Sequence, residues 1–170
     1  MPGNDDGPVV RLQDREIEAL IAERKKVTPE MLQKLSQLRP AGDNKLTQDC
    51  EVIGEDGSVF RIILRQNRLN PLDFAAIFAY RLPDTGRLFH LRRYDSRAEH
   101  RNPIERQRFT AYHVHQATAR YQARGFDEEG YAEPSDRFTD LHGALQCLFA
   151  DCGCDIPPTP QILLFPGGLP

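Results

Sequence analysis

Three turn signals divide residues 46–94 into short apolar stretches, and their spacing constrains the fold more than any other feature. The signals are Glu55-Asp56-Gly57, Asn70-Pro71 and Pro83-Asp84-Thr85-Gly86. Apolar stretches bounded by such turns are typical of β-strands. We expect strands over residues 46–53, 58–66, 72–80, 87–94 and 109–115. Because short connections join neighbouring strands, the pattern predicts an antiparallel meander of about five strands, with one long connection over residues 95–107.

Helical periodicity flanks this strand region on both sides. Ile17, Leu20 and Ile21 form an apolar stripe that predicts a helix over residues 13–26. Thr28 can cap a second helix, in which Pro29 occupies the first turn and which ends before residue 40. A third apolar stripe predicts a helix from about residue 135 to 151. The fold class is therefore α+β, an antiparallel sheet of about five strands with two N-terminal helices and one C-terminal helix.

The length and composition favour one soluble globular domain. We expect a disordered stretch over residues 1–9, a single α+β domain over residues 10–156 and a Pro-rich tail over residues 157–170. No window approaches the roughly 18 apolar residues that span a bilayer. The first ten residues lack the basic and apolar regions of a secretory signal, so we expect a cytoplasmic protein without membrane partners. In that compartment the four cysteines are expected as thiols, and C-x4-C-x-C at Cys147, Cys152 and Cys154 matches no strong zinc signature.

The net charge of −3 conceals a basic, histidine-rich block over residues 81–124. This block holds four of the five histidines and ten of the 22 basic residues, all of them arginine, against four acidic residues. Its local charge is therefore +6, while the other segments are acidic. A basic block of this kind points to an anionic partner, either a nucleic acid or an acidic protein.

The spacing of the histidines places them on particular faces of the expected strands. Because successive side chains alternate, His113 and His115 share one face. On the preceding strand His90 and Arg92 share a face. If the two strands pair, the histidine pair opposes either His90 and Arg92 or Arg93 and Asp95, and the sequence leaves both alternatives open. His100 lies in the long connection, beside Arg97 and Arg101.

Two histidines beside an arginine suit acid–base cleavage of an RNA phosphodiester. One neutral imidazole takes the proton of the ribose 2′-hydroxyl and one imidazolium protonates the leaving oxygen, while arginine holds the phosphate. This chemistry needs no cofactor and no metal. As an alternative, His-x-His is a metal pair, with a third ligand from His90, His100 or Asp95, but no HExxH-type spacing supports that interpretation.

Structural explanations compete with each functional one. The arginines can form a solvated surface that pairs with the acidic segment over residues 125–140. Tyr94, Tyr112 and Tyr121 suit base stacking between arginines, but aromatic strand residues are as often core residues. His142 is expected to have a structural or surface role.

Four short motifs resemble an uncharacterised bacterial domain-of-unknown-function family that is similar to the TumE-type toxins of toxin–antitoxin systems. The resemblance covers roughly residues 55–152, and its motifs are Arg93-Tyr94-Asp95, His100-Arg101-Asn102, His113-Val114-His115 and Tyr131-Ala132-Glu133-Pro134-Ser135. TumE-type toxins are regarded as ribonucleases. The resemblance therefore implies a site of His100, His113 and His115, supported by Arg93 and Asp95. The chain departs from the TumE pattern at Glu99-His100, where those toxins have two histidines, and the resemblance says nothing of the N-terminal helices or the tail.

We therefore expect a cytoplasmic RNA-cleaving toxin or antiviral defence protein that acts without a metal. Its partners would be RNA or another nucleic acid, and a cognate antitoxin or other acidic protein. The alternative is a non-catalytic phage or mobile-element module, such as an inhibitor of a defence system, whose basic face contacts a protein or nucleic-acid machine. The expected catalytic residues are His113, His115 and His100, the phosphate-binding residues Arg92, Arg93, Arg101 and Tyr94, and the supporting residues Asp95 and His90.

Overall fold

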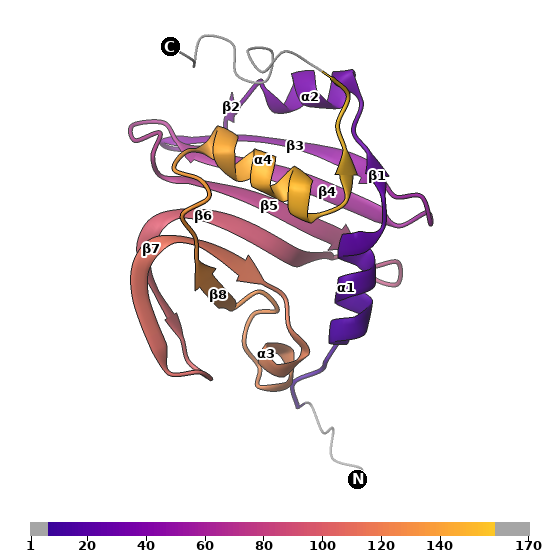
Figure 1. Ribbon diagram of the computed structural model, residues 1–170, viewed down its shortest axis with the longest axis vertical. Coiled ribbons are helices and arrows are strands. Elements are labelled where there is room, and N and C mark those ends of the chain that lie inside the picture. The colour runs from indigo at the N-terminus through magenta and orange to yellow at the C-terminus, as the bar shows by residue number, and fades with distance from the viewer. Residues whose placement is uncertain (1–6, 159–170) are drawn as a thin grey trace.

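An antiparallel sheet of seven strands forms the centre of the computed structural model, which describes residues 7–158 (Figure 1). The strands lie in the order in which they follow one another along the chain, so the predicted meander and the α+β class are confirmed. Seven strands replace the expected five. They are β2 (Arg39–Pro40), β3 (Lys45–Ile53), β4 (Val59–Asn67), β5 (Phe74–Arg81), β6 (Leu88–Asn102), β7 (Gln107–Gln116) and β8 (Tyr131–Pro134).

Three helices confirm the predicted segments with shorter boundaries, namely α1 (Asp14–Ala22), α2 (Pro29–Leu35) and α4 (Leu141–Asp151). A short helix that was not predicted, α3 (Ala119–Ala123), follows β7. The Thr28 side chain accepts a hydrogen bond from the backbone N–H of Met31, which is the expected cap of α2. At the start of α4, Asp140 accepts from the backbone N–H of Gly143 at 2.7 Å. The last helix therefore begins later than predicted, because Asp140 caps the helix instead of lying inside its first turn.

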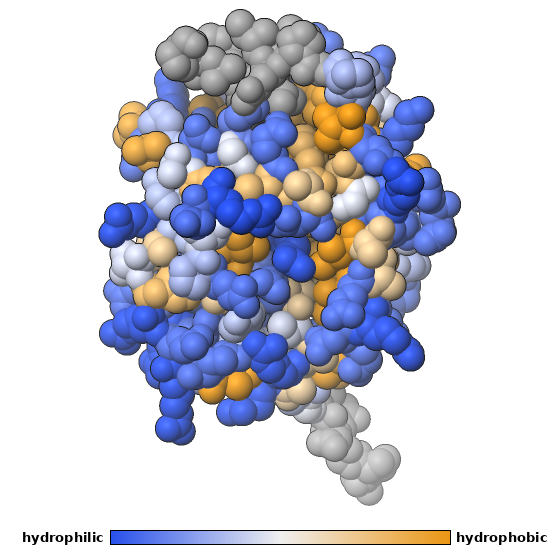
Figure 2. Space-filling view, in the orientation of Figure 1, coloured by the Kyte–Doolittle hydropathy of each residue, from blue (hydrophilic) through white to orange (hydrophobic). Residues whose placement is uncertain are grey.

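Helix α4 crosses one face of the sheet and closes the main hydrophobic core (Figure 1). Its apolar stripe, with Leu145 and Leu148 fully buried, packs on strands β5 and β6. Phe60 and Phe78 stack beneath it with their ring centroids 5.0 Å apart. On the face shown in Figure 2, hydrophilic side chains cover most of the surface, and apolar side chains appear in small separate areas.

Lys25 fixes the ends of α1 and α4 to each other from inside the core. It lies in the two-residue strand β1 (Lys25–Lys26), which pairs in parallel with β9 (Cys154–Asp155). Its side chain is fully buried, and Nζ donates to the carbonyl oxygens of Leu20, Ile21 and Cys152 at 2.7, 2.9 and 2.7 Å. These are the carbonyl groups that helix C-termini leave without partners. The predicted helix over residues 13–26 is therefore wrong in its last turn, where β1 forms instead.

The expected long connection over residues 95–107 is also wrong, because β6 continues through it. Strand β6 runs to Asn102 and turns directly into β7, so the two strands form one long hairpin (Figure 1). Arg106 in the turn has a positive φ of 56°. The polar sequence of this extension lacks the apolar alternation that indicates a strand. It is stabilised instead by pairing with β7.

Three further expectations concern membrane-spanning helices, the two ends of the chain and the cysteines. No helix among the described residues is long and apolar enough to cross a membrane. Most of the expected disordered stretch over residues 1–9, and most of the Pro-rich tail over residues 157–170, lie outside the described residues. The four cysteines are free thiols, as expected.

Candidate active site

The register of β6 and β7 decides which residues oppose the histidine pair. Arg93 pairs with His115 and Asp95 pairs with His113. Of the two alternatives that the sequence left open, the second is therefore correct. Because paired residues in a sheet point to the same face, Arg93, Asp95 and both histidines lie on one face of the hairpin, opposite to α4.

A β-bulge brings His100 to the same face. Asp95 pairs with His113 but Ala98 pairs with Ala111, so β6 contains one residue more than β7 in this interval. One extra residue reverses the alternation of the faces beyond it. Even-numbered residues of β6 after the bulge, including His100 and Asn102, therefore share the face of Asp95.

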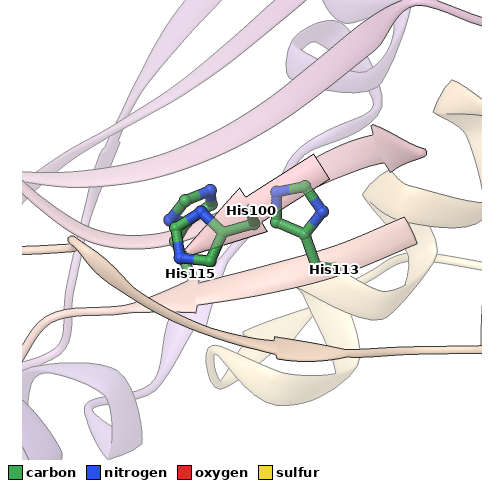
Figure 3. Close-up of side chains that lie close together, drawn as sticks. All are labelled: His100, His113 and His115. Carbon is green, nitrogen blue, oxygen red and sulfur yellow. The ribbon is translucent and has the colours of Figure 1, made fainter. Parts of the chain in front are cut away.

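The three imidazole rings converge as a consequence (Figure 3). Their centroids are 4.8 Å apart for His100 and His115, 4.9 Å for His113 and His115, and 5.3 Å for His100 and His113. Phe109 contacts two of these rings, at 5.5 Å from His100 and 5.6 Å from His113. His113 and His115 are buried, with exposed fractions of 3% and 8%, so the rings are held by packing.

Each imidazole has one nitrogen fixed by a carbonyl oxygen. Nδ1 of His113 bonds to the backbone oxygen of Ala111, and Nδ1 of His115 to that of Glu129, both at 2.8 Å. Nε2 of His100 bonds to Oδ1 of Asn102 at 2.8 Å. A carbonyl oxygen only accepts hydrogen bonds, so the nitrogen facing it carries the proton.

The orientation of the Asn102 amide is fixed by β8. Its Oδ1 accepts from the backbone N–H of Ala132 at 2.9 Å, and its Nδ2 donates to the carbonyl oxygen of the same residue at 2.8 Å. This pair of bonds assigns the oxygen and nitrogen of the amide unambiguously. The bond to His100 therefore has the imidazole as its donor.

Asp95 connects the histidines to Arg93. Its Oδ1 accepts from Nε of Arg93 at 2.8 Å, while its Oδ2 lies 3.1 Å from Nε2 of His115 and 3.6 Å from Nε2 of His113. Burial opposes ionisation of this carboxyl group, but the hydrogen bonds from His115 and Arg93 outweigh burial and lower its pKa. Asp95 is therefore a carboxylate at neutral pH.

Burial lowers the pKa values of His113 and His100, and the neighbouring His115 lowers them further. Both rings are therefore neutral at pH 7. His115 differs in its bonding, because both of its nitrogens face oxygen acceptors. A neutral imidazole can donate only one of these two bonds, whereas an imidazolium donates both.

The cluster lines a cavity of about 710 Å³. Its walls come from β3, β4, β5, β6 and β7. Two exposed cationic residues, Lys45 and Arg65, lie on the wall formed by β3 and β4, and Arg93 lies beside the histidines. A cavity of this volume has the size of a small-molecule or nucleotide site, and its walls carry both hydrogen-bond donors and cations.

Other predicted site residues lie elsewhere. Tyr94 is fully buried on the α4 side, where its hydroxyl donates to Asp151 at 2.8 Å, so its ring is not available to stack on a base. Arg92 lies on the same side, near Asp151 and Tyr94. These two residues are therefore removed from the predicted phosphate-binding set. Arg101 is exposed near the tip of the hairpin and is not part of the cavity wall.

His90 lies outside the histidine cluster and is linked to it through Glu129. Its Nδ1 lies 2.9 Å from Oε1 of Glu129, and the backbone oxygen of Glu129 holds His115. Burial raises the pKa of Glu129, but the bond to His90 outweighs it and the net pKa is lowered. A second bulge between Phe78 and Ala79 separates His90 from Arg92, so the expected shared face of these two residues is wrong.

Several contacting residues were not predicted from the sequence. Asn102 and Glu129 fix two of the imidazoles, and Lys45 and Arg65 line the cavity. Asn102 lies two residues after His100, a spacing that places both side chains on one face of a strand, but the segment was expected to be a loop. The arginines of the basic block were expected to pair with the acidic segment over residues 125–140, and Arg87 does so with Glu128. Arg93, Arg108 and Arg120 pair instead with acidic residues inside the block, Asp95, Glu99 and Glu105.

The three clustered histidines are also the candidate ligands for a metal ion. Among residues 7–158, His100, His113 and His115 form the one cluster of three metal-ligating side chains, with ligand atoms within 4.8 Å of one another. The cysteines Cys147, Cys152 and Cys154 form no such cluster within that range.

Comparison with known proteins adds no further assignment. The chain matches no family model, and no curated protein and no solved structure gives a significant match.

Proposed function

We propose that this protein cleaves RNA by acid–base catalysis at the histidine cluster. The observation that carries the proposal is the unequal bonding of two adjacent imidazoles. His113 is neutral and has its Nε2 lone pair outside hydrogen-bond distance of Asp95, at 3.6 Å. His115 has an oxygen acceptor at each nitrogen, the backbone oxygen of Glu129 at 2.8 Å and Oδ2 of Asp95 at 3.1 Å, so it is the ring that we assign as the proton donor. A base and an acid thus stand side by side at the wall of one cavity.

In the proposed reaction, Nε2 of His113 takes the proton of a ribose 2′-hydroxyl. The resulting oxygen attacks the adjacent phosphorus, and the bond to the 5′ oxygen breaks. Nε2 of His115 gives its proton to that leaving oxygen, so the products are a 2′,3′-cyclic phosphate and a free 5′-hydroxyl. Each proton transfer of this kind contributes roughly 10²- to 10⁴-fold to the rate.

Three cations are placed to receive the phosphate. The Nε of Arg93 donates to Asp95, and Arg93 is one of the residues that line the cavity. Lys45 and Arg65 line the same cavity from the neighbouring strands. Their charges would stabilise the negative charge that develops on the phosphoryl oxygens in the transition state.

This activity would suit a cytoplasmic toxin or defence protein with an antitoxin or another acidic protein as its partner, as the sequence resemblance implies. The site would then be the part of the surface that such a partner must cover.

The test is cleavage of single-stranded RNA by the purified chain in buffer containing EDTA. The variant is His113→Gln, and the matched control is His142→Gln, which changes a histidine on α4, on the other side of the sheet. We expect cleavage by the wild type and the control, products with 2′,3′-cyclic phosphate ends, and a loss of roughly 10²-fold or more in the variant. Circular dichroism verifies that the variant is folded. Equal cleavage by the variant and the wild type would refute the assignment.

The alternative of a non-catalytic binding module is favoured by one separate observation. Four exposed arginines lie on the distal part of the β6–β7 hairpin, namely Arg97, Arg101, Arg106 and Arg108. They would bind an acidic partner without the histidines. Under this alternative, no RNA is cleaved, and charge reversal of the four arginines abolishes partner binding while His113→Gln does not.

A further inference from the structure

The histidine cluster has the hydrogen-bond pattern of a metal site. Each of the three imidazoles donates one ring N–H to a carbonyl oxygen, at 2.8 Å in every case. Metal-ligating histidines almost always hold their second nitrogen in this way, because the bond fixes the tautomer and the orientation of the ring. In a neutral ring the nitrogen that does not face the carbonyl oxygen carries a lone pair. These nitrogens are Nε2 of His113, Nε2 of His115 and Nδ1 of His100.

Asp95 supplies a fourth ligand in the right place. One of its oxygens is occupied by Arg93, which leaves Oδ2 at 3.1 Å from Nε2 of His115 and 3.6 Å from Nε2 of His113. Two ligands at about 2.1 Å from a tetrahedral zinc ion lie about 3.4 Å from each other. The two observed separations lie on either side of that value, so Oδ2 has about the spacing of a zinc ligand from each of these two imidazole nitrogens.

The remaining mismatch is small. The three histidine ligand atoms lie within 4.8 Å of one another, and side-chain rotations that shorten the widest separation by up to about 1.4 Å complete a tetrahedral set. His100 is the least buried of the three rings, so its rotation displaces the least surrounding structure. A cation also resolves the contact between His115 and Asp95, where a lone pair of a neutral imidazole would otherwise face a carboxylate.

We propose that His100, His113, His115 and Asp95 bind a divalent zinc ion, and that zinc and RNA cleavage exclude each other. Three imidazoles and one carboxylate form a borderline ligand set that suits zinc rather than magnesium or calcium. Zinc binding itself rests on the geometry alone. Inhibition rests on the proposed function, because the ion occupies the lone pair with which His113 would take the proton and the position from which His115 would donate one.

The binding test is calorimetric titration of ZnCl₂ into the full chain after removal of metals with EDTA. We expect one zinc ion per chain, and binding weakened by about 100-fold in His100→Gln, whose side chain is half-buried and whose loss leaves the core intact. His142→Gln is the matched control and should bind as the wild type does. Asp95→Asn provides a second variant, which we also expect to bind zinc more weakly.

Cobalt distinguishes this site from the cysteines. Co²⁺ bound by the proposed ligands gives the visible absorption of tetrahedral coordination without thiolate-to-cobalt charge transfer. Absence of zinc binding, equal binding by His100→Gln and the wild type, or a thiolate band would overturn the proposal.

The regulatory part is tested by RNA cleavage in EDTA and in ZnCl₂. Cleavage in EDTA that zinc suppresses in the wild type supports the inference. Cleavage in EDTA that zinc does not affect overturns the inhibition and leaves the proposed function intact. Binding of zinc by a chain that cleaves no RNA in EDTA overturns the proposed function and leaves the metal site intact.

Discussion

Lys25→Met would remove the ammonium group that joins two helix ends, and its cost follows from three hydrogen bonds. Methionine keeps the aliphatic length of lysine but leaves the carbonyl oxygens of Leu20, Ile21 and Cys152 without this donor. A buried polar group that loses its partner costs roughly 1 to 3 kcal/mol. Part of this cost is offset, because the variant no longer buries a charge, and burial lowers the pKa of Lys25.

The expected net loss is therefore about 3 kcal/mol in the free energy of unfolding. For a chain of this size, that loss lowers Tm by about 6 to 12 °C. The assay is urea unfolding at pH 7, followed by far-ultraviolet circular dichroism.

Lys26→Met is the matched control for this experiment. Lys26 is the exposed neighbour in the same strand, and its substitution should change stability by less than about 0.5 kcal/mol. If Lys25→Met and Lys26→Met unfold at the same urea concentration, the three bonds contribute nothing measurable and the reasoning is refuted.

Two further predictions concern single side chains. Asn102→Ala removes the amide that holds both His100 and β8, so it should cost about 1 to 3 kcal/mol in stability and also weaken zinc binding at His100. The exposed Thr110→Ala on β7 is the control and should do neither; urea unfolding and calorimetry test both effects. Burial opposes ionisation of Asp151, but the bonds from Arg137 and Tyr94 outweigh it and lower its pKa below 3.8. Its stabilisation is therefore full above pH 3.8 and is lost as the pH falls through the lowered pKa, so the advantage of the wild type over Asp151→Asn should be about 1 to 2 kcal/mol at pH 6 and smaller at pH 3. An advantage that does not change between these two pH values would contradict the assignment.

The sequence predicted the sheet because its turns are encoded locally. Glu55-Asp56-Gly57 and Pro83-Asp84-Thr85-Gly86 contain the residues that these turns require, and Gly57 and Gly86 have positive φ angles of 85° and 72°. The same holds for α2, where Thr28 and Pro29 mark the first turn. In each case the residues that determine the structure are neighbours along the chain.

The histidine pair was predictable for a related reason. His113 and His115 lie two residues apart on a strand, so alternation alone places them on one face. Whether Arg93 and Asp95 or His90 and Arg92 oppose them depends on register, which is determined by pairing between distant residues. Local sequence carries no signal for that choice.

The extension of β6 and the place of His100 could not be predicted. The segment from Ser96 to Asn102 is polar and charged, and it is a strand only because β7 pairs with it. Lys25 was missed for a similar reason. A lysine in a helical periodicity is expected at the surface, and the third of the carbonyl oxygens that bind Lys25, that of Cys152, comes from the distant end of α4.

The bulge after Asp95 makes the cluster depend on the number of residues in β6 as well as on their identities. With one residue fewer between Asp95 and Ala98, the strand would keep every histidine in its sequence, but His100 and Asn102 would turn to the opposite face. A comparison of related chains by motif alone would then count a complete set of site residues where no site exists. The length of this interval is thus a criterion for recognising the site in other sequences, and it is independent of the residues that form it.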